Sequence, residues 1–195
     1  MQVIGNRDTR LSQFRKCWIS GGEVTIVGAW GAGTSKEITA NWNSPFEGES
    51  IGNKIPMAGG VAQAVTDMTS VSTLNSRQTW EGNRPTSFTV ELKLYALEDP
   101  DVEVMQPIRA LETMMAPDVS SGVLSFGGRL PDRICLNIGS KIIYTDLVID
   151  SLSQPFDKEI DSQGRFVRVT LNLQLSTLTM VSKDMLRKGY GLQQA

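Results

Sequence analysis

RFVRVTLNLQLSTLTM, residues 165–180, decides the fold of this 195-residue chain, because apolar and polar side chains alternate along it. Strict alternation predicts a β-strand with one buried face and one exposed face. The exposed face has a single charge and otherwise short or amide groups, where a solvated sheet face is usually richer in Lys and Glu. The predicted inward residues are Val167, Val169, Leu171, Leu173 and Leu175, and the outward ones are Arg168, Thr170, Asn172, Gln174 and Ser176.

The predicted strand is long for a chain of this size. Fully extended, it spans about 50 Å, whereas a compact globule of this chain length is about 40 Å across. We therefore expect the strand to project beyond its own domain and to be built into a larger assembly of identical copies.

A second strand and a helix are predicted in the middle of the chain. From Ser87 to Ala96 the apolar residues again alternate with polar ones, and Asp99 can cap a helix that begins at Pro100. Pro107 lies inside the helical pattern and should kink the helix or split it in two. The strand is expected to bury Phe88, Val90, Leu92, Leu94 and Ala96, and the helix Val104, Ile108, Leu111 and Met115, with Met105 and Met114 beside this stripe.

Shorter signals complete the prediction. Gly139 and Ser140 predict a tight hairpin turn, Asp161 and Gly164 a second turn, and Ser182 and Gly189 the two ends of a C-terminal helix. Residues 80–85 are expected to make a corner, and residues 61–68 a short helix or an arm that orders on assembly. Further strands are expected at 23–30, within 37–42, at 133–138, at 141–144 and at 147–156.

These elements predict a mainly β (α+β) fold, an antiparallel β-sandwich or barrel-forming sheet with one packed helix. We divide the chain into an N-terminal arm at 1–22, a β domain at 23–180 with its helix at about 100–116, and a short C-terminal helix and tail at 181–195.

Composition excludes several classes of function. The chain has no histidine, so Ser-His-Asp and Cys-His catalysis and imidazole metal sites are not available to it. A net charge of -2 argues against a protein that binds nucleic acid through its phosphates.

The cysteines predict neither a disulfide nor a metal site. Cys17 and Cys135 are far apart in the sequence and form no CxxC pair, so we expect reduced, partly buried thiols. The longest apolar runs are far shorter than the roughly 20 residues that span a bilayer, so no membrane anchor is expected. We therefore expect no enzyme activity, no cofactor and no metal.

Four motifs have both a chemical and a structural interpretation. GAWGAG, residues 28–33, follows a strand but lacks the spacing and the GK[ST] of a phosphate loop, so we expect a glycine bend. The acidic residues Asp157, Glu159 and Asp161 are expected to form a solvated turn, because the calcium-loop spacing is missing. The helix methionines are expected to fill the core. We expect Trp18, Trp30, Trp42 and Trp80 to make core or subunit contacts, although they could also line a sugar platform.

The order and spacing of WEGNRP, SFTVELKLYA, DPDVEVMQPIRALETMMAP, RICLNIG and the LVIDSLSQPF/DSQG/RFVRVTLNLQL hairpin resemble a known family. This is the family of tail-tube-like baseplate proteins, of the tube initiator type, from contractile-tailed bacteriophages and related contractile injection systems. The resemblance covers residues 80–179. It implies a structural subunit of the virion tail baseplate, assembled in the host cytoplasm, that forms a six-fold ring and initiates or extends the inner tail tube. Its partners would be further copies and other baseplate hub and tail tube proteins, and DNA would pass through without adhering.

Other functions stay open at this point. The main tail tube protein, a tube terminator and a hub adaptor are close variants of the same interpretation. A monomeric β-sandwich carbohydrate-binding module would need exposed tryptophans grouped in a shallow groove. A carboxylate-dependent hydrolase would need two buried acids with opposed pKa shifts, and no pair in the sequence suggests one.

Overall fold

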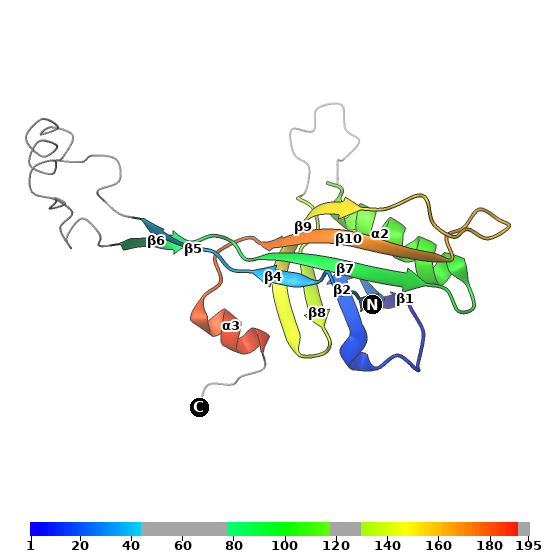
Figure 1. The fold of residues 1–195 in the computed structure, drawn as a ribbon, viewed down its shortest axis with the longest axis horizontal. Helices are drawn as coiled ribbons and strands as arrows, with labels where there is room; N and C mark the ends of the chain where they lie inside the picture. Colours follow the sequence, from blue (N-terminus) through cyan, green and yellow to red (C-terminus); the bar gives the residue numbers. More distant parts are fainter. Residues whose placement is uncertain (44–77, 118–129, 191–195) are drawn as a thin grey trace, which may run out of the picture. The chain divides into compact units, whose positions relative to one another are not determined.

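The computed structural model describes residues 1–43, 78–117 and 130–190, which fall into two compact units (Figure 1). The larger unit combines residues 1–38 with the chain from Pro85 onward and contains the main sheet and the helices. In the smaller unit, Thr39–Arg84, the described part is a two-stranded antiparallel ribbon of β5 (Ala40–Asn43) and β6 (Thr79–Asn83). The helix or arm expected at 61–68 lies outside the described residues. Trp80 and Gly82, expected in a corner, are part of β6.

The larger unit is built on a closed barrel of six antiparallel strands. The last strand of the barrel returns to the first where Ala29 and Trp30 lie opposite Lys93 and Leu92. In the order in which they pair, these strands are β3 (Val24–Trp30), β2 (Lys16–Gly21), β8 (Ile134–Ile138), β9 (Ile142–Ser153), β10 (Arg168–Thr177) and β7 (Ser87–Tyr95). Two short strands extend the sheet: β1 (Gln2–Gly5) runs parallel to β3, and β4 (Ser35–Glu37) runs antiparallel to β7. The predicted mainly β fold with a barrel-forming antiparallel sheet is confirmed.

The barrel is filled from the inward faces of β7 and β10. Leu173 lies opposite Val90, and Leu171 lies opposite Leu92, so the predicted apolar faces meet in register. All of the predicted inward residues of the two strands are buried except Val167 and Ala96. These two residues lie just beyond the ends of β10 and β7 and are half-buried. Burial of these apolar side chains is the main force that holds the two strands together.

The expectation that other copies complete the longest predicted strand is wrong for β10. This strand has ten residues rather than the full 165–180 segment, and both of its neighbours, β7 and β9, belong to the same chain. Closure of the sheet into a barrel supplies a partner on each side without a second molecule.

Residues 1–22, expected as an N-terminal arm, contribute β1 and β2 to the main sheet. β2 pairs with β3 on one side and β8 on the other, and its Cys17 and Ile19 are fully buried. A one-turn helix, η1 (Gln13–Arg15), connects β1 to β2. Both strands are short and polar residues surround them, so their alternation is too brief to be recognised in the sequence.

The predicted helix is present as one continuous helix of 15 residues, and its hydrogen-bond pattern changes beside Pro107 rather than splitting it in two. A π-helical segment, η3 (Asp101–Met105), continues directly into α2 (Gln106–Met115). Asp99 caps it as predicted, because its carboxylate accepts a hydrogen bond from the Asp101 N–H. Met114 is buried and Met115 only half-buried, which reverses the predicted order: Met114 continues the buried stripe three residues after Leu111 and lies over Gly21 and Ile134.

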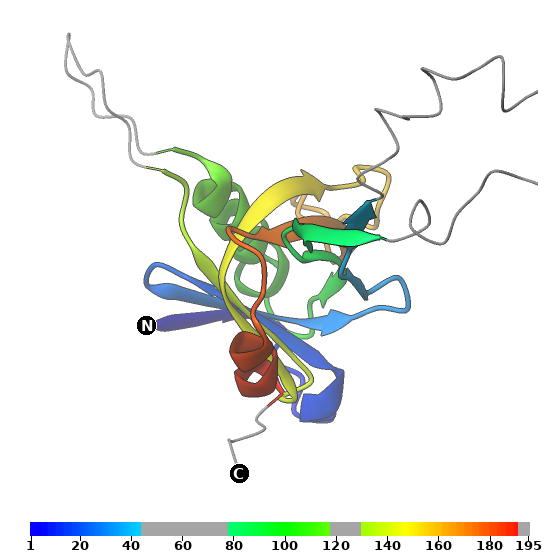
Figure 2. The same cartoon turned by 90° about the vertical axis from the view of Figure 1, so that its left-hand side faces the viewer.

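The chain from β8 to the C-terminal helix follows the predicted turns with one correction. Gly139 and Ser140 have φ angles of 61° and 55°, as the tight turn between β8 and β9 requires. The strands predicted at 141–144 and 147–156 are one strand, β9, in which Asp146 (φ 58°) forms a bulge that keeps the pairing with β8 continuous. The helix α3 (Lys183–Gly189) is capped by Ser182, which accepts from the Met185 N–H. Figure 2 shows α3 beside the β8–β9 hairpin.

Candidate functional site

The GAWGAG segment binds a carboxylate from its own chain. The Gly33 N–H donates to Oε2 of Glu91 at 2.7 Å, and the Gly31 N–H donates to the Glu91 carbonyl oxygen. A Cβ at Gly31 would come within 2.2 Å of the Glu91 carboxyl carbon, so only glycine leaves room for this contact. The hydrogen bond from Gly33, together with Lys93, holds the pKa of Glu91 below its ordinary value. The segment is thus a glycine bend that attaches β4 to β7.

The acidic turn between β9 and β10 is solvated and internally paired. Asp161 accepts from the backbone N–H groups of Arg165 and Gln163 and also binds the Arg165 guanidinium at 2.7 Å. The backbone N–H of Arg165 and its side chain lower the pKa of Asp161. Asp157 pairs with Lys158. In the described part of the chain, no cluster of three or more His, Cys, Asp or Glu side chains could hold a metal ion.

The thiols and the tryptophans have different environments. Cys17 is buried, which raises the pKa of its thiol to about 12, and Cys135 is half-buried; both are free thiols. Trp18 and Trp30 are half-buried in the barrel strands. Trp42 and Trp80 lie opposite each other in the β5–β6 ribbon and are 58% and 52% exposed. Trp18 and Trp30 thus belong to the larger unit, and Trp42 and Trp80 belong to the smaller one.

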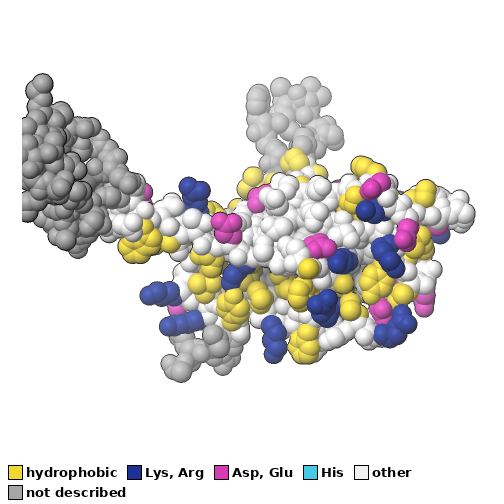
Figure 3. All heavy atoms as spheres, viewed as in Figure 1, with side chains coloured by type: hydrophobic (Ala, Val, Ile, Leu, Met, Phe, Trp, Pro, Cys, Tyr) yellow, Lys and Arg dark blue, Asp and Glu magenta, His cyan; other side chains and the backbone are white. Residues whose placement is uncertain are grey.

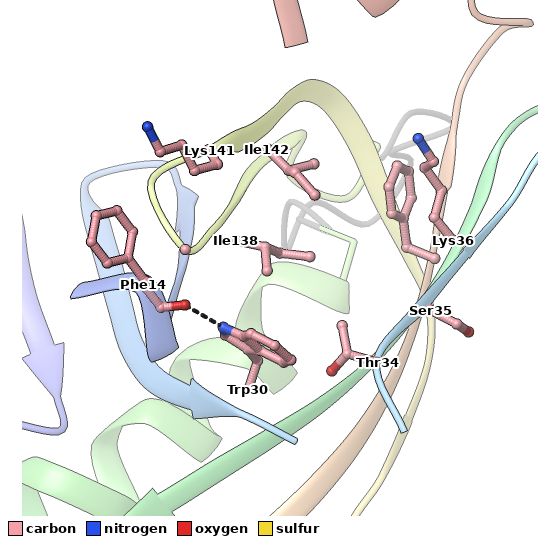
Figure 4. Close-up of a pocket in the computed structure, with 10 residues that line it drawn as sticks. Phe14, Trp30, Thr34, Ser35, Lys36, Ile138, Lys141 and Ile142 are labelled. Carbon is pink, nitrogen blue, oxygen red and sulfur yellow. Dashed lines mark hydrogen bonds between the residues drawn. The ribbon is translucent and has the colours of Figure 1, made fainter. Parts of the chain in front are cut away.

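A cavity of about 360 Å³ lies between β4 and the β8–β9 hairpin of the larger unit (Figure 4). Its wall is mainly apolar, and Trp30 is fixed there by a hydrogen bond from its Nε1 to the Phe14 carbonyl oxygen at 3.0 Å. Figure 4 shows Lys141 and Lys36 at the two ends of the cavity, with Ile142 and Ile138 between them. The lining residues are Phe14, Trp30, Thr34, Ser35, Lys36, Phe88, Ile138, Gly139, Lys141 and Ile142.

Lys36 is held at this cavity by two tyrosines. Its Nζ donates to the hydroxyl oxygens of Tyr144 and Tyr190, and it also lies 5.5 Å and 4.8 Å from the centres of these two rings. Partial burial alone lowers the pKa of Lys36, but the hydrogen bonds to Tyr190 and Tyr144 outweigh it and raise that pKa. None of the ion pairs within the described residues includes Lys36 or Lys141.

The outer face of the sheet has a continuous polar strip. Ser151, Gln174, Thr89 and Ser35 lie side by side on β9, β10, β7 and β4, and all four are exposed. We call this row of four residues the polar row. In Figure 3, the surface over β10 and β7 is largely white, with isolated charged side chains. At Gln174, the nearly uncharged outward face predicted for β10 therefore continues as one row across four strands.

A scan against protein-family models finds no match, and a search of the curated proteins finds no similar sequence. No helix among residues 1–43, 78–117 and 130–190 is both long and apolar enough to cross a membrane.

Sequence reasoning missed the cavity and the Lys36 cluster. The three members of this cluster are separated by 108 and 154 residues, counted from Lys36 to Tyr144 and from Lys36 to Tyr190. Nothing local in the sequence connects them, because barrel closure and the position of α3 bring them together. The one available signal was a lysine in a short strand next to a glycine bend, which many surface strands share.

Proposed function

We propose that this chain is a structural subunit of a phage tail baseplate, which forms a ring of six copies and initiates or extends the inner tail tube. It performs no catalysis. The polar row is the observation that carries this proposal, because a tube that passes DNA needs a wall that hydrogen-bonds water and does not bind phosphate. Retention of DNA requires clustered Lys and Arg, which release counterions from the phosphates. The row contains neither.

The ends of the sheet supply surfaces on which copies could pair. β1 has β3 as its only strand partner and β4 has β7, so the described sheet ends in two edge strands of different sequence. Contacts between two different edges are head-to-tail, and such contacts close into a ring when the rotation between copies permits. Ring formation through these edges would also protect them from uncontrolled pairing.

Electron microscopy and sedimentation of the purified chain test the proposal. We expect rings with a central hole and a sedimenting species near six copies. A chain that stays monomeric at high concentration, and that is not incorporated into particles when its neighbouring tail proteins are present, would contradict it.

A matched pair of variants tests the role of the polar row. Gln174→Lys introduces a cation into the row, whereas Gln163→Lys makes the same change on the exposed turn before β10. If the row lines the tube, both variants form rings, but only Gln174→Lys rings retain single- and double-stranded DNA at low salt. Equal retention by both variants would place the row away from the lumen.

A main tail tube protein, a tube terminator or a hub adaptor would use the same surfaces. Incorporation into particles separates them, since a tube initiator is found at the baseplate only, a main tube protein along the whole tail and a terminator at its far end.

A carbohydrate-binding module is the second candidate, because Trp42 and Trp80 are exposed and lie opposite each other on the ribbon. Paired exposed tryptophans can stack on sugar rings. Binding of the wild type to a glycan array that is lost in Trp80→Ala would support this candidate. Absence of any glycan binding by the wild type would exclude it.

A further inference from the structure

We propose that the cavity between β4 and the β8–β9 hairpin binds an organic anion, namely an apolar body that ends in one carboxylate. The carboxylate would lie against Lys36 and the exposed Tyr190 hydroxyl, and the apolar body would lie in the cavity. This inference goes beyond the proposed ring function and does not depend on it.

The cavity wall favours an apolar guest. Phe88 is almost fully buried and stacks edge-on against Tyr144, with ring centres 4.8 Å apart, so the inner wall is fixed. Ile138 and Ile142 supply aliphatic surface, and Trp30 supplies an indole face whose N–H is already bonded to Phe14. A volume of about 360 Å³ is within the range of small-molecule sites in proteins.

The donors at the cavity favour an anion. An ammonium group has three N–H donors, and two of those on Lys36 go to Tyr144 and Tyr190. Each tyrosine oxygen accepts from Lys36, so each hydroxyl keeps its own hydrogen to donate. Tyr144 is only 4% exposed and Tyr190 is 44% exposed, so the cluster offers one Lys36 N–H and the Tyr190 O–H as accessible donors, with a net charge of +1. No carboxylate of the described chain lies within ion-pair distance of Lys36 or Lys141.

A carboxylate is the anion that fits this donor set best. Its two oxygens can accept together from the remaining Lys36 N–H and from a tyrosine hydroxyl, and charge-assisted bonds of this kind are about twice as strong as neutral ones. Lys141 lines the other end of the cavity, as Figure 4 shows, and adds a second positive charge at longer range. A cationic amphiphile with the same tail would be repelled by both ammonium groups.

Calorimetric titration with decanoate, decanol and decyltrimethylammonium tests the inference. The three molecules share the apolar tail and differ in charge, and they are used below their micelle concentrations. We expect decanoate to bind with a dissociation constant below about 1 mM and at least about tenfold more tightly than either of the others. No binding of decanoate, or equal binding of the cationic molecule, would overturn the proposal.

Two lysine variants localise the bound anion. Lys36→Met keeps the length of the side chain and removes its charge, and Lys183→Met makes the same change at the exposed start of α3. Decanoate affinity should fall at least about tenfold in Lys36→Met, the loss expected for one charge-assisted hydrogen bond, and stay unchanged in Lys183→Met. Equal effects in the two variants would show that decanoate binds elsewhere and would overturn the proposal.

A third variant tests the apolar half of the site. Ile142→Trp should fill part of the cavity and lower decanoate affinity, while Lys36 keeps its charge. Thermal unfolding of each variant is measured in parallel, so that a loss of fold is not mistaken for a loss of binding.

The ring function and the anion site are tested independently, because ring formation is measured separately by sedimentation. Failure of decanoate binding leaves the proposed ring function standing, and failure of ring formation leaves this site standing.

Discussion

β10 and β4 are on opposite sides of β7, yet they are held in different ways. β10 has ten residues, a strand on each side and four fully buried leucine and valine side chains. β4 has three residues, one strand partner and no fully buried side chain, and the contact of Gly33 with Glu91 secures its start. β10 therefore contributes to the core of the barrel, whereas β4 is available for contacts with ligands or other copies.

This difference changes how assembly should be understood. A strand that is paired on both sides has no backbone groups left for another molecule, so β10 can contribute to an assembly only through its outward side chains. In the main sheet of the described structure, the short edge strands β1 and β4 can still pair their backbones with another copy. The inner and outer faces of β10 thus have separate roles, one in stability and one in surface chemistry.

The largest expected effect is on the inner face of β10. Leu173→Asp places a carboxylate among Val90, Leu152 and other apolar neighbours, where burial of an unpaired charge costs several kcal/mol. We expect the variant to be unfolded or aggregated, measured by circular dichroism and denaturant titration. Gln174→Asp makes a comparable change one residue later, on the exposed face, and should stay folded. A soluble, cooperative Leu173→Asp variant would show that the faces are reversed.

The elements that could be predicted from the sequence are those with long, regular patterns. The faces of β7 and β10, the Asp99 cap and the Gly139 turn depend on neighbouring residues, so local rules were sufficient. The position of β2 in the barrel was not predictable, because it depends on pairing with β8, more than a hundred residues later. Barrel closure depends on only two residue pairs between β3 and β7, and the cavity follows from that closure.

The second effect should detach β4 and leave β10 in place. Gly31→Ala introduces a Cβ that would meet the Glu91 carboxylate, so the flexible Glu91 side chain must turn away, and loss of its hydrogen bond from the Gly33 N–H costs about 1 kcal/mol. Hydrogen exchange measured by NMR should show faster exchange of the Ser35 and Lys36 amides, with little change in β10. Uniformly faster exchange in both strands would mean that β4 and β10 unfold as one unit.

The third effect depends on pH and concerns the contact between Gly33, just before β4, and Glu91 of β7. The folded pKa of Glu91 lies below its ordinary value of 4.5, so its contribution is complete above that value and is lost as the pH falls through the folded pKa. The protection factor of the Gly33 amide should therefore fall on acidification below about pH 4.5, before that of the β10 amides. Glu91→Gln should remove this pH dependence, and a Gly33 protection factor that changes with pH in the same way in Glu91→Gln and in the wild type would contradict the role of the carboxylate.

The smallest effect concerns α3, which brings Tyr190 to Lys36 of β4. Ser182→Ala removes the side-chain acceptor of the Met185 N–H, and loss of such a cap costs about 1 kcal/mol. Because Leu186 and Met185 are only half-buried against the core, α3 should loosen while the barrel keeps its unfolding midpoint. Exchange of the Met185 amide should become faster, whereas Ser162→Ala, on the exposed turn before β10, should leave it unchanged. If the unfolding midpoint of the barrel falls in Ser182→Ala but not in Ser162→Ala, α3 unfolds in the same cooperative unit as β10. The contrast between the stable strand β10 and the locally held strand β4 would then not apply to α3.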